Sequence, residues 1–379
     1  MTPKQGNPFV IGRYISDYYF CDRKEETEFL IKQIQNGRDV ALISPRRMGK
    51  TGLIKHVFDQ SEIKDNYITL FIDIYATSSL SDLVTLLGKE VYNKVIAKNR
   101  SWIDRLKDVV KSASPKLSVD PISGEPSIGL DFNTGTTETT LSEIFKFINE
   151  APMPCVIAID EFQQCEKYDD ENVPALLRTH MQGCNNARFI FAGSEHSMMN
   201  NMFLSPAKPF YQSCIITGIG PIAMEKYVDF AVERFADYGK RADREVLCGV
   251  YRRYEGCTWF VHMMYNELFA LVSENEPMTD GLISQAENNI IGRQEYGYSD
   301  IMSHLSPRQR ELMTALALSG GTENPLSINF IKEYGLHSPS SVQSALRALT
   351  ELGFVSNVRG TTRIYDYFFA AWLRSTLQI

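Results

Sequence analysis

The chain lacks the features that mark membrane, secreted and zinc-binding proteins. No apolar run approaches the roughly 18–20 residues that a helix needs to span a bilayer. The segment from Met1 to Val10 does not have the charged-then-apolar order of a secretory signal. The seven cysteines are odd in number and include no Cys-x-x-Cys pair, which argues against a disulfide framework and a zinc site. We therefore expect a cytoplasmic protein with reduced thiols and no membrane contact.

Positive charge is also scarce. Lys and Arg number 39 against 46 Asp and Glu, so the net charge is −7, unlike the basic composition of a protein that coats nucleic acid. The hydrophobic content of 44% and the charged content of 22% are those of an ordinary globular chain. At about 150 residues per domain, the 379 residues predict two to three domains.

Apolar segments of strand length alternate with segments of helical spacing over the first 220 residues. Strands are expected at 39–43, 67–75, 154–159, 188–192 and 213–218, and helices at 50–58, 79–98, 141–150 and 172–184. Strands and helices that alternate in this way form parallel β-α-β units. The sequence therefore predicts an α/β fold with a parallel sheet.

The remainder of the chain has a different character. Residues 99–140 carry several Pro and Gly residues and a Thr-rich run, which favours a loop-rich insertion with or without a hairpin. Residues 224–292 are mostly helical in pattern, and 301–379 show three helical segments and then two β-prone pieces, the outline of a winged helix-turn-helix. We expect a core at 1–220, a helical domain at 221–300 and a winged-helix domain at 301–379.

One octapeptide, SPRRMGKT, carries the strongest functional signal. It matches the phosphate-loop pattern G-x-x-x-x-G-K-[ST] except at the first position, where Ser44 stands for Gly. Because a strand precedes it and a helix follows, backbone N–H groups would surround an anionic phosphate. Lys50 would add positive charge at the β- and γ-phosphates, and the Thr51 hydroxyl would be a ligand for Mg²⁺. The residues expected to bind the nucleotide are Ser44, Pro45, Arg46, Arg47, Met48, Gly49, Lys50, Thr51 and Gly52.

An acid pair, Asp160 and Glu161, directly follows the apolar strand at 154–159. In P-loop enzymes the first acid holds the Mg²⁺ shell, and the adjacent Glu polarises a water for attack on the γ-phosphate. Open α/β sheets bind ligands at the carboxyl ends of their strands, where the phosphate loop also lies. The sequence therefore predicts a site for ATP or ADP with Mg²⁺, in which Thr51 and Asp160 are metal ligands and Lys50 and Glu161 are catalytic.

Ser194 ends the next strand, in the order RFIFAGS. One interpretation makes it a catalytic residue that contacts the γ-phosphate or the attacking water. In the other, its hydroxyl caps the turn that follows. The sequence favours neither.

These motifs together resemble the archaeal-type ATPases, a branch of the signal-transduction P-loop ATPases related to the AAA-type and origin-recognition ATPases. The resemblance covers nearly the whole chain. Within these ATPases, the chain is similar to a Bacteroides-type group. Its marks are FCDRKEE near the start, SPRRMGKT, AIDEFQ, FAGS followed by SMMNNMF, and the terminal YDYFFAAWL.

The resemblance implies a P-loop NTPase core of the additional-strand, catalytic-Glu type, in which the strand before Ser194 lies between the two motif strands. A helical lid at 221–300 and the winged helix would follow. It also implies that Arg23, in the box from Asp22 to Glu26, and Val10 lie beside the adenine.

The chain departs from the pattern of this group at three places. Ser44 replaces a glycine, Gly256-Cys257-Thr258 replaces a Gly-x-Pro in the lid, and Ser213 stands where relatives often carry an arginine. An arginine that neutralises charge is worth roughly 10³–10⁵ in turnover in P-loop enzymes. Arg46, Arg47 and Lys208 are the alternative cations.

Three functions are compatible with the sequence. The first is an ATP-driven conformational switch with slow hydrolysis, in which a homo-oligomer or a protein effector is the partner. The second is a DNA-binding regulator whose nucleotide site is mainly structural, and the third is an inactive scaffold. The DNA option is weak, because 301–379 hold seven Lys and Arg against five acids, and the expected recognition helix at 338–352 offers Arg347 as its one cation. We favour the switch.

Overall fold

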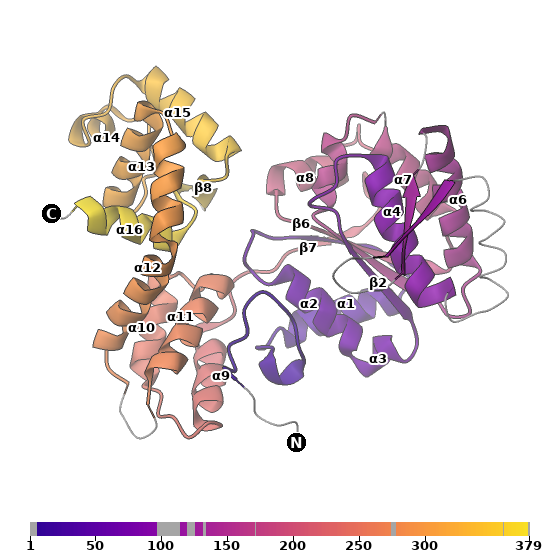
Figure 1. Cartoon of the computed structure of the whole chain (residues 1–379), viewed down its shortest axis with the longest axis horizontal. Helices are drawn as coiled ribbons and strands as arrows, with labels where there is room; N and C mark the ends of the chain where they lie inside the picture. The colour runs from indigo at the N-terminus through magenta and orange to yellow at the C-terminus, as the bar shows by residue number, and fades with distance from the viewer. Residues whose placement is uncertain are drawn as a thin grey trace. The chain divides into compact units, whose positions relative to one another are not determined.

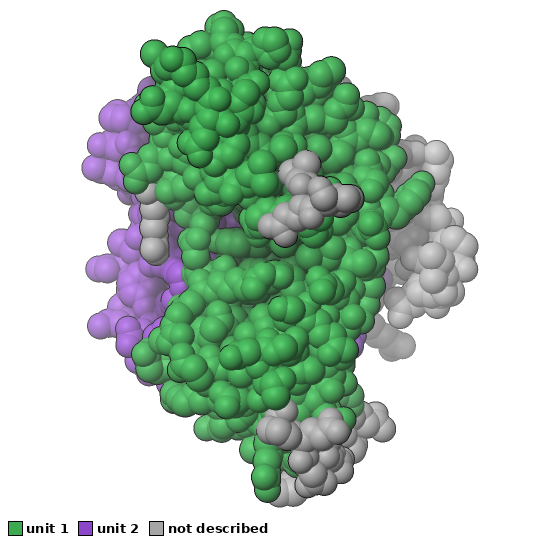
Figure 2. Space-filling view, turned by 90° about the vertical axis from the view of Figure 1, so that its left-hand side faces the viewer, with its two compact units in different colours: residues 1–11, 224–379 green, residues 12–223 purple. Residues whose placement is uncertain are grey.

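The computed structural model of the chain describes residues 6–96, 114–119, 126–131, 134–170, 172–273, 278–358 and 360–377. The chain divides into two compact units. Unit 1 comprises residues 1–11 and 224–379, and unit 2 comprises residues 12–223; they are coloured separately in Figure 2. Within the described ranges, no helix combines the length and the apolarity that a membrane span requires.

Unit 2 alternates strands and helices along the chain. Its strands are β1 (Val40–Ile43), β2 (Ile68–Asp73), β3 (Ser114–Val119), β4 (Pro126–Asp131), β5 (Cys155–Asp160), β6 (Ala187–Gly193) and β7 (Ile215–Thr217). Its α-helices are α1 (Lys24–Gln35), α2 (Lys50–Asp59), α3 (Ser61–Lys64), α4 (Leu80–Val91), α6 (Thr134–Asn149), α7 (Val173–Gln182) and α8 (His196–Leu204). Three shorter helical turns are η1 (Asp17–Tyr19), η2 (Tyr92–Ile96) and η3 (Phe162–Lys167).

Five of these strands form one parallel sheet in the order β2-β5-β6-β1-β7. Figure 1 shows α4, α6 and α7 over one face of this sheet and α1, α2 and α3 over the other. Strand β6 lies between β1, which leads into the phosphate loop, and β5, which ends in the acid pair. The predicted α/β fold with a parallel sheet is thereby confirmed.

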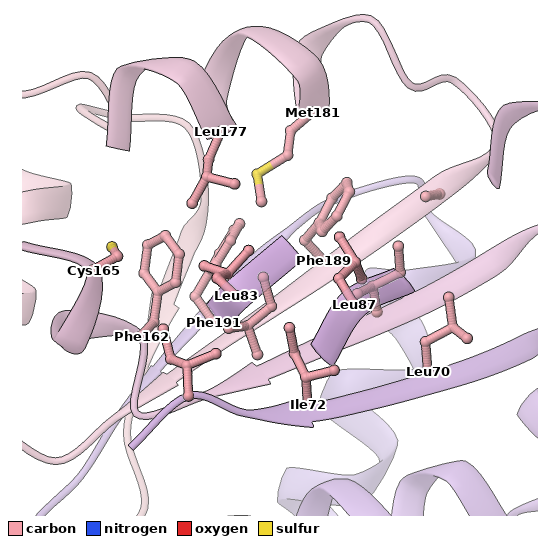
Figure 3. Packing of buried hydrophobic residues seen from close by; sticks show 14 of the residues in the cluster. Leu70, Ile72, Leu83, Leu87, Phe162, Cys165, Leu177, Met181, Phe189 and Phe191 are labelled. Atoms are coloured by element: carbon pink, nitrogen blue, oxygen red, sulfur yellow. The ribbon is translucent and has the colours of Figure 1, made fainter. Parts of the chain in front are cut away.

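The hydrophobic core of unit 2 fills the space between the sheet and the helices α4, α6, α7 and α8. Alternate residues of each strand face this side, as expected for a period of two; Phe189 and Phe191 of β6 are examples. Figure 3 shows these two rings beneath Leu177 and Met181 of α7. The core packs against one face of the sheet and so supports the strands that carry the phosphate loop and the acid pair.

The segment at 99–140 is described only in part. Residues 99–113, 120–125 and 132–133 lie outside the described residues, whereas β3 and β4 pair antiparallel. Helix α6 begins at Thr134, so the Thr-rich run that we expected to be irregular forms its first turns. Thr137 is buried there, and burial of this kind outweighs the low intrinsic helix propensity of threonine.

Unit 1 is mostly helical. Its helices are α9 (Met224–Ala236), α10 (Arg244–Arg253), α11 (Thr258–Leu271), α12 (Gly281–His304), α13 (Pro307–Ser319), α14 (Ile328–Glu333), α15 (Pro339–Glu351) and α16 (Tyr367–Leu377), and its strands are β8 (Val355–Val358) and β9 (Thr361–Ile364). Helix α12 runs without a break through residue 300, where the sequence suggested a domain boundary.

The segments from α13 to β9 form the winged helix that the sequence predicted. Local capping starts its helices: the Ser306 side chain accepts from the backbone N–H of Gln309 in a capping box, and Ser338 accepts from that of Ser341. The strands β8 and β9 then pair antiparallel as the wing. Signals confined to a few neighbouring residues are therefore sufficient to delimit this part of the fold.

We predict that Phe191→Ala destabilises unit 2 by about 3–5 kcal/mol, because a buried aromatic ring leaves a cavity. Phe191 is 1% exposed, and its ring centroid lies 4.6 Å from that of Phe162 and 5.3 Å from that of Phe210. Urea denaturation followed by circular dichroism measures the loss. Leu204→Ala, at a position 54% exposed, is the control and should change stability by less than about 0.5 kcal/mol. Equal stability of the two variants would contradict this account of the core.

Candidate functional site

The phosphate loop connects the end of β1 to the start of α2. Two of its residues have left-handed backbone conformations, Arg47 at φ 67° and Gly49 at φ 96°. Glycine adopts this region without steric cost, which explains Gly49 at the last position before the helix. Helix α2 begins directly after Gly49, and the free N–H groups in the first turn of a helix are a favourable place for an anion.

Lys50 is the cation of this loop. Its side chain is buried, and its Nζ donates to the carbonyl of Ser44 at 2.9 Å and to that of Pro45 at 3.4 Å. Burial lowers the pKa of Lys50, and the nearby carboxylates of Glu161 and Asp160 oppose that change. The ammonium group is therefore held inside the loop, close to two acids.

Ser44, at the position where the motif has glycine, is fully buried and forms a specific contact. Its hydroxyl donates to the carbonyl of Ile219 at 2.7 Å, and its backbone N–H donates to the carbonyl of Gly193. Ser44 is not among the residues with positive φ, so the backbone does not require glycine here. A Cβ at Gly218 would lie 2.6 Å from the carbonyl oxygen of Ile43, so glycine is required at Gly218 instead.

The acid pair meets the loop because β5 and β1 are the two neighbours of β6. The Thr51 hydroxyl donates to Asp160 Oδ2 at 2.5 Å. Asp160 is 3% exposed, and burial raises its pKa, while the bond from Thr51 acts in the opposite sense. The expected metal ligands therefore lie in direct contact.

Glu161 has a left-handed backbone, at φ 55°, and its carboxylate contacts Ser194, the residue that follows β6. Ser194 donates to Glu161 Oε2 at 2.7 Å, and Gln163 Nε2 donates to the same oxygen at 2.5 Å. The hydroxyl of Ser194 therefore donates to Glu161. The residue that immediately precedes α8 is Glu195, so Ser194 is not the N-cap of that helix. The structure thus brings together two of the expected catalytic residues.

Two arginines of the expected nucleotide site form hydrogen bonds with other residues of the site. Arg46 Nε donates to Ser194 Oγ at 3.3 Å. Arg23 is buried, and it donates to the carbonyl of Met48 at 3.1 Å and to Glu26 at 2.8 Å. Arg23 therefore holds the backbone of the phosphate loop at Met48.

Val10 belongs to unit 1, whereas the phosphate loop and the acid pair belong to unit 2. It forms a backbone hydrogen bond with the side chain of His262, and burial lowers the pKa of that histidine to about 4. The neighbouring Phe9 is buried, and its carbonyl accepts from Asn266 at 2.7 Å. The placement of Val10 beside the adenine stays a prediction.

Gln163 and Gly193 are site residues that sequence reasoning missed. Gln163 is 2% exposed, and its Oε1 has no hydrogen-bond partner among the described residues. A Cβ at Gly193 would lie 2.5 Å from that oxygen, so the glycine leaves room for the amide. The quoted motifs AIDEFQ and FAGS contain both residues, but only the strand order places them next to each other.

The alternative cation Lys208 is already paired, since its Nζ lies 2.8 Å from Glu166. At the position of the missing arginine, Ser213 donates to the carbonyl of Phe210 at 2.7 Å and closes a turn. Arg46, in contrast, contacts Ser194, which in turn contacts Glu161 of the acid pair.

The donors present fit a magnesium ion that is shared with a nucleotide. Mg²⁺ takes one or two protein oxygen ligands together with phosphate oxygens and water. A hydroxyl and a buried carboxylate in contact, Thr51 and Asp160, are a donor set of that kind. Among the described residues, no group of three or more His, Cys, Asp or Glu side chains forms a metal site within the protein.

We predict that Ser44→Ala destabilises unit 2 by about 1–3 kcal/mol, because the buried carbonyl of Ile219 loses its donor. The Ser44 hydroxyl contacts that carbonyl at 2.7 Å. The midpoint of urea denaturation measures the change. Ser61→Ala removes an exposed hydroxyl and serves as the control, with an expected change below about 0.5 kcal/mol. A Ser44→Ala protein as stable as the wild type would show that the contact contributes nothing.

Comparisons with known families agree with this arrangement. Residues 20–263, well over half of the chain, match the family described as "ATPase domain predominantly from Archaea". Residues 296–375 match the family described as "probable winged helix domain". An uncharacterized ATP-binding protein of Methanocaldococcus jannaschii is 24% identical over 157 residues, which are 38% of this chain and 43% of that relative.

Solved structures share the fold along nearly the whole chain. The Walker-type ATPase of Pyrococcus abyssi is 17% identical with a TM-score of 0.62, and the comparison covers 97% of this chain and 99% of that one. The ORC2 protein of Aeropyrum pernix, in ADPNP and ADP complexes, is 14% identical with a TM-score of 0.57 and 98% coverage of each chain. The ORC1 protein of the same organism, in complex with DNA, is 13% identical with a TM-score of 0.53, covering 94% of this chain and 93% of that one.

The phosphate loop, the adjoining acid pair and the match over residues 20–263 lead to one conclusion: the chain belongs to the family of ATPase domains found predominantly in Archaea and is an ATP-binding, P-loop ATPase-like protein with a C-terminal winged helix.

Proposed function

We propose that the protein hydrolyses ATP slowly, with Mg²⁺, and that it acts as a nucleotide-driven conformational switch. The observation that carries the proposal is the convergence of Thr51, Asp160, Glu161 and Ser194 at the carboxyl edge of the sheet, next to Lys50. Phosphoryl transfer from a bound triphosphate requires acids, a hydroxyl and a cation in one place, and this edge of the sheet brings them together.

The residues have distinct roles in this proposal. The loop from Ser44 to Gly52 binds the phosphates through its backbone N–H groups, and Lys50 supplies positive charge. Thr51 and Asp160 would hold Mg²⁺, which, when bound, offsets the negative charge of the phosphate oxygens.

Glu161 is the proposed general base. A water oxygen bonds to the γ-phosphorus, the bond from that phosphorus to the β–γ bridging oxygen breaks, and the water proton passes to the Glu161 carboxylate. ADP and inorganic phosphate are the products. Ser194, whose hydroxyl lies 2.7 Å from Glu161 Oε2, would position that carboxylate.

The proposed division of the chain is a core at 1–220, a lid at 221–300 and a winged helix at 301–379. Contacts inside unit 1 support a lid that acts together with the winged helix. The ring of Tyr254, beside the lid helix α10, lies 5.4 Å from Phe368 of α16, and its hydroxyl donates to Glu287 at 2.7 Å. Arg363 of the wing pairs with Glu255. A change in the lid would therefore reach the winged helix directly.

We predict that Glu161→Gln keeps ATP affinity and lowers turnover by about 10²–10⁴, because the general base is lost. Lys50→Ala should lose both affinity and turnover, since the buried cation of the loop is removed. Phosphate release and nucleotide binding, both measured with Mg²⁺, report the two effects. Glu62→Gln changes an exposed acid and is the matched control. Equal turnover in all four proteins would refute the proposed hydrolysis.

DNA binding by the winged helix is the second candidate, and the likeness to a solved structure determined with DNA is its support. The cations of the winged helix argue against DNA binding, because most of them already form ion pairs or hydrogen bonds within the protein. Arg308 pairs with Glu311 at 3.0 Å, and Arg347, on the expected recognition helix, pairs with Glu351 at 2.9 Å. Arg374 donates to a backbone carbonyl.

We therefore predict no saturable binding of duplex DNA at about 50 mM salt, because affinity for DNA comes mainly from cations that contact phosphates. Fluorescence anisotropy of a labelled duplex in a salt titration measures it. Saturable binding that weakens steeply with salt would favour the regulator over the switch.

The third candidate is an inactive scaffold. Nucleotide that stays bound to the protein without being hydrolysed would support it.

A further inference from the structure

The cations around the phosphate loop differ in how their charge is used. Lys50 donates to two loop carbonyls and lies close to two acids, and Arg23 is paired with Glu26 at 2.8 Å. Farther away, Lys208 is paired with Glu166. Each of these side chains has an acidic neighbour that offsets its charge.

Arg46 is different, because its described contacts are with neutral groups. Its Nε donates to Ser194 Oγ at 3.3 Å, and its guanidinium carbon lies 5.7 Å from the centroid of the exposed Tyr75 ring. Arg46 is exposed, so its guanidinium is accessible to a ligand at the loop.

Arg46 is also one end of a chain of hydrogen bonds that reaches the proposed base. The guanidinium donates to the Ser194 hydroxyl, and that hydroxyl donates to Glu161 Oε2 at 2.7 Å. Gln163 donates to the same carboxylate oxygen at 2.5 Å. A hydroxyl between a cation and a carboxylate is polarised by both, so each bond strengthens the other. In this arrangement Glu161 is held at the end of β6.

We infer that Arg46 recognises the terminal phosphate of ATP, and that it leaves the Ser194 hydroxyl to do so. The inference rests on the proposed ATP-binding function of the site and deepens it. A guanidinium forms a charge-assisted, bidentate contact with a phosphate, which is stronger than one bond to a neutral hydroxyl. Arg46 therefore exchanges Ser194 for the γ-phosphate.

ATP differs from ADP by its third phosphate. ADP lacks this group, so with ADP Arg46 stays on Ser194. The site thereby distinguishes the two nucleotides at a single side chain.

The binding experiment compares a non-hydrolysable ATP analogue with ADP, using the full chain and Mg²⁺. Arg46→Ala should weaken the analogue by about 10-fold and change the affinity for ADP by less than about 2-fold. Arg46→Lys keeps the charge and should recover part of the loss. Lys208→Ala, the matched control, removes a cation that is paired with Glu166 and should alter neither affinity. An equal loss for both nucleotides, or no loss for either, overturns the inference.

Turnover provides the second arm. Arg46→Ala should lower ATP turnover by at least about 100-fold, while Lys208→Ala stays within about 2-fold of the wild type. If the wild type turns over and Arg46→Ala turns over equally fast, this inference fails and the proposed hydrolysis stands. If the wild type does not turn over, the proposed hydrolysis fails, and the binding arm still decides the role of Arg46.

Discussion

The strand order of the parallel sheet is the constraint on which the rest of the site depends. Strand β6 separates β1 from β5, so the phosphate loop and the acid pair lie at the same edge, one on each side of β6. The hydrogen bond from Thr51 to Asp160 closes this edge across 109 positions of sequence. Burial shifts the pKa of Lys50 downward and that of Asp160 upward, so each group alone would be costly to keep charged. Their proximity offsets part of that cost, and the core behind the sheet keeps them there.

Local signals in the sequence were sufficient for the elements and for the residues at their ends. The strands, the winged helix and the positions of Lys50 and Asp160 follow from periodicity, capping residues and one motif. These local signals do not predict which residues of neighbouring strands contact each other. The pairing of Ser194 with Glu161 depends on β6 lying beside β5, and the role of Gln163 depends on the absence of a side chain at Gly193. Neither fact has a signal within a window of neighbouring residues.

The helical part of the chain shows the same limit. Its helices were expected, but the sequence does not show that Tyr254 packs on Phe368 of α16 or that α12 continues through residue 300. Buried acids hold α12 to its neighbours: Glu287 accepts from Tyr254 and Arg253, and Glu267 pairs with Arg293. A buried carboxylate is stable only with such partners. The helices of 224–300 and the winged helix belong to one compact unit, although their sequence patterns are distinct.

The serine at the first position of the phosphate loop has one more consequence. Ile219, whose carbonyl accepts from Ser44, precedes the start of α9 at Met224 by only a few residues, and α9 opens the second stretch of unit 1. The loop is thus tethered, through a buried bond of 2.7 Å, to the strip of chain that leads out of the core. A glycine has no side chain and could not make this link. The serine that departs from the motif therefore links the loop to the segment that joins the two units, so a displacement of either would disturb this buried hydrogen bond.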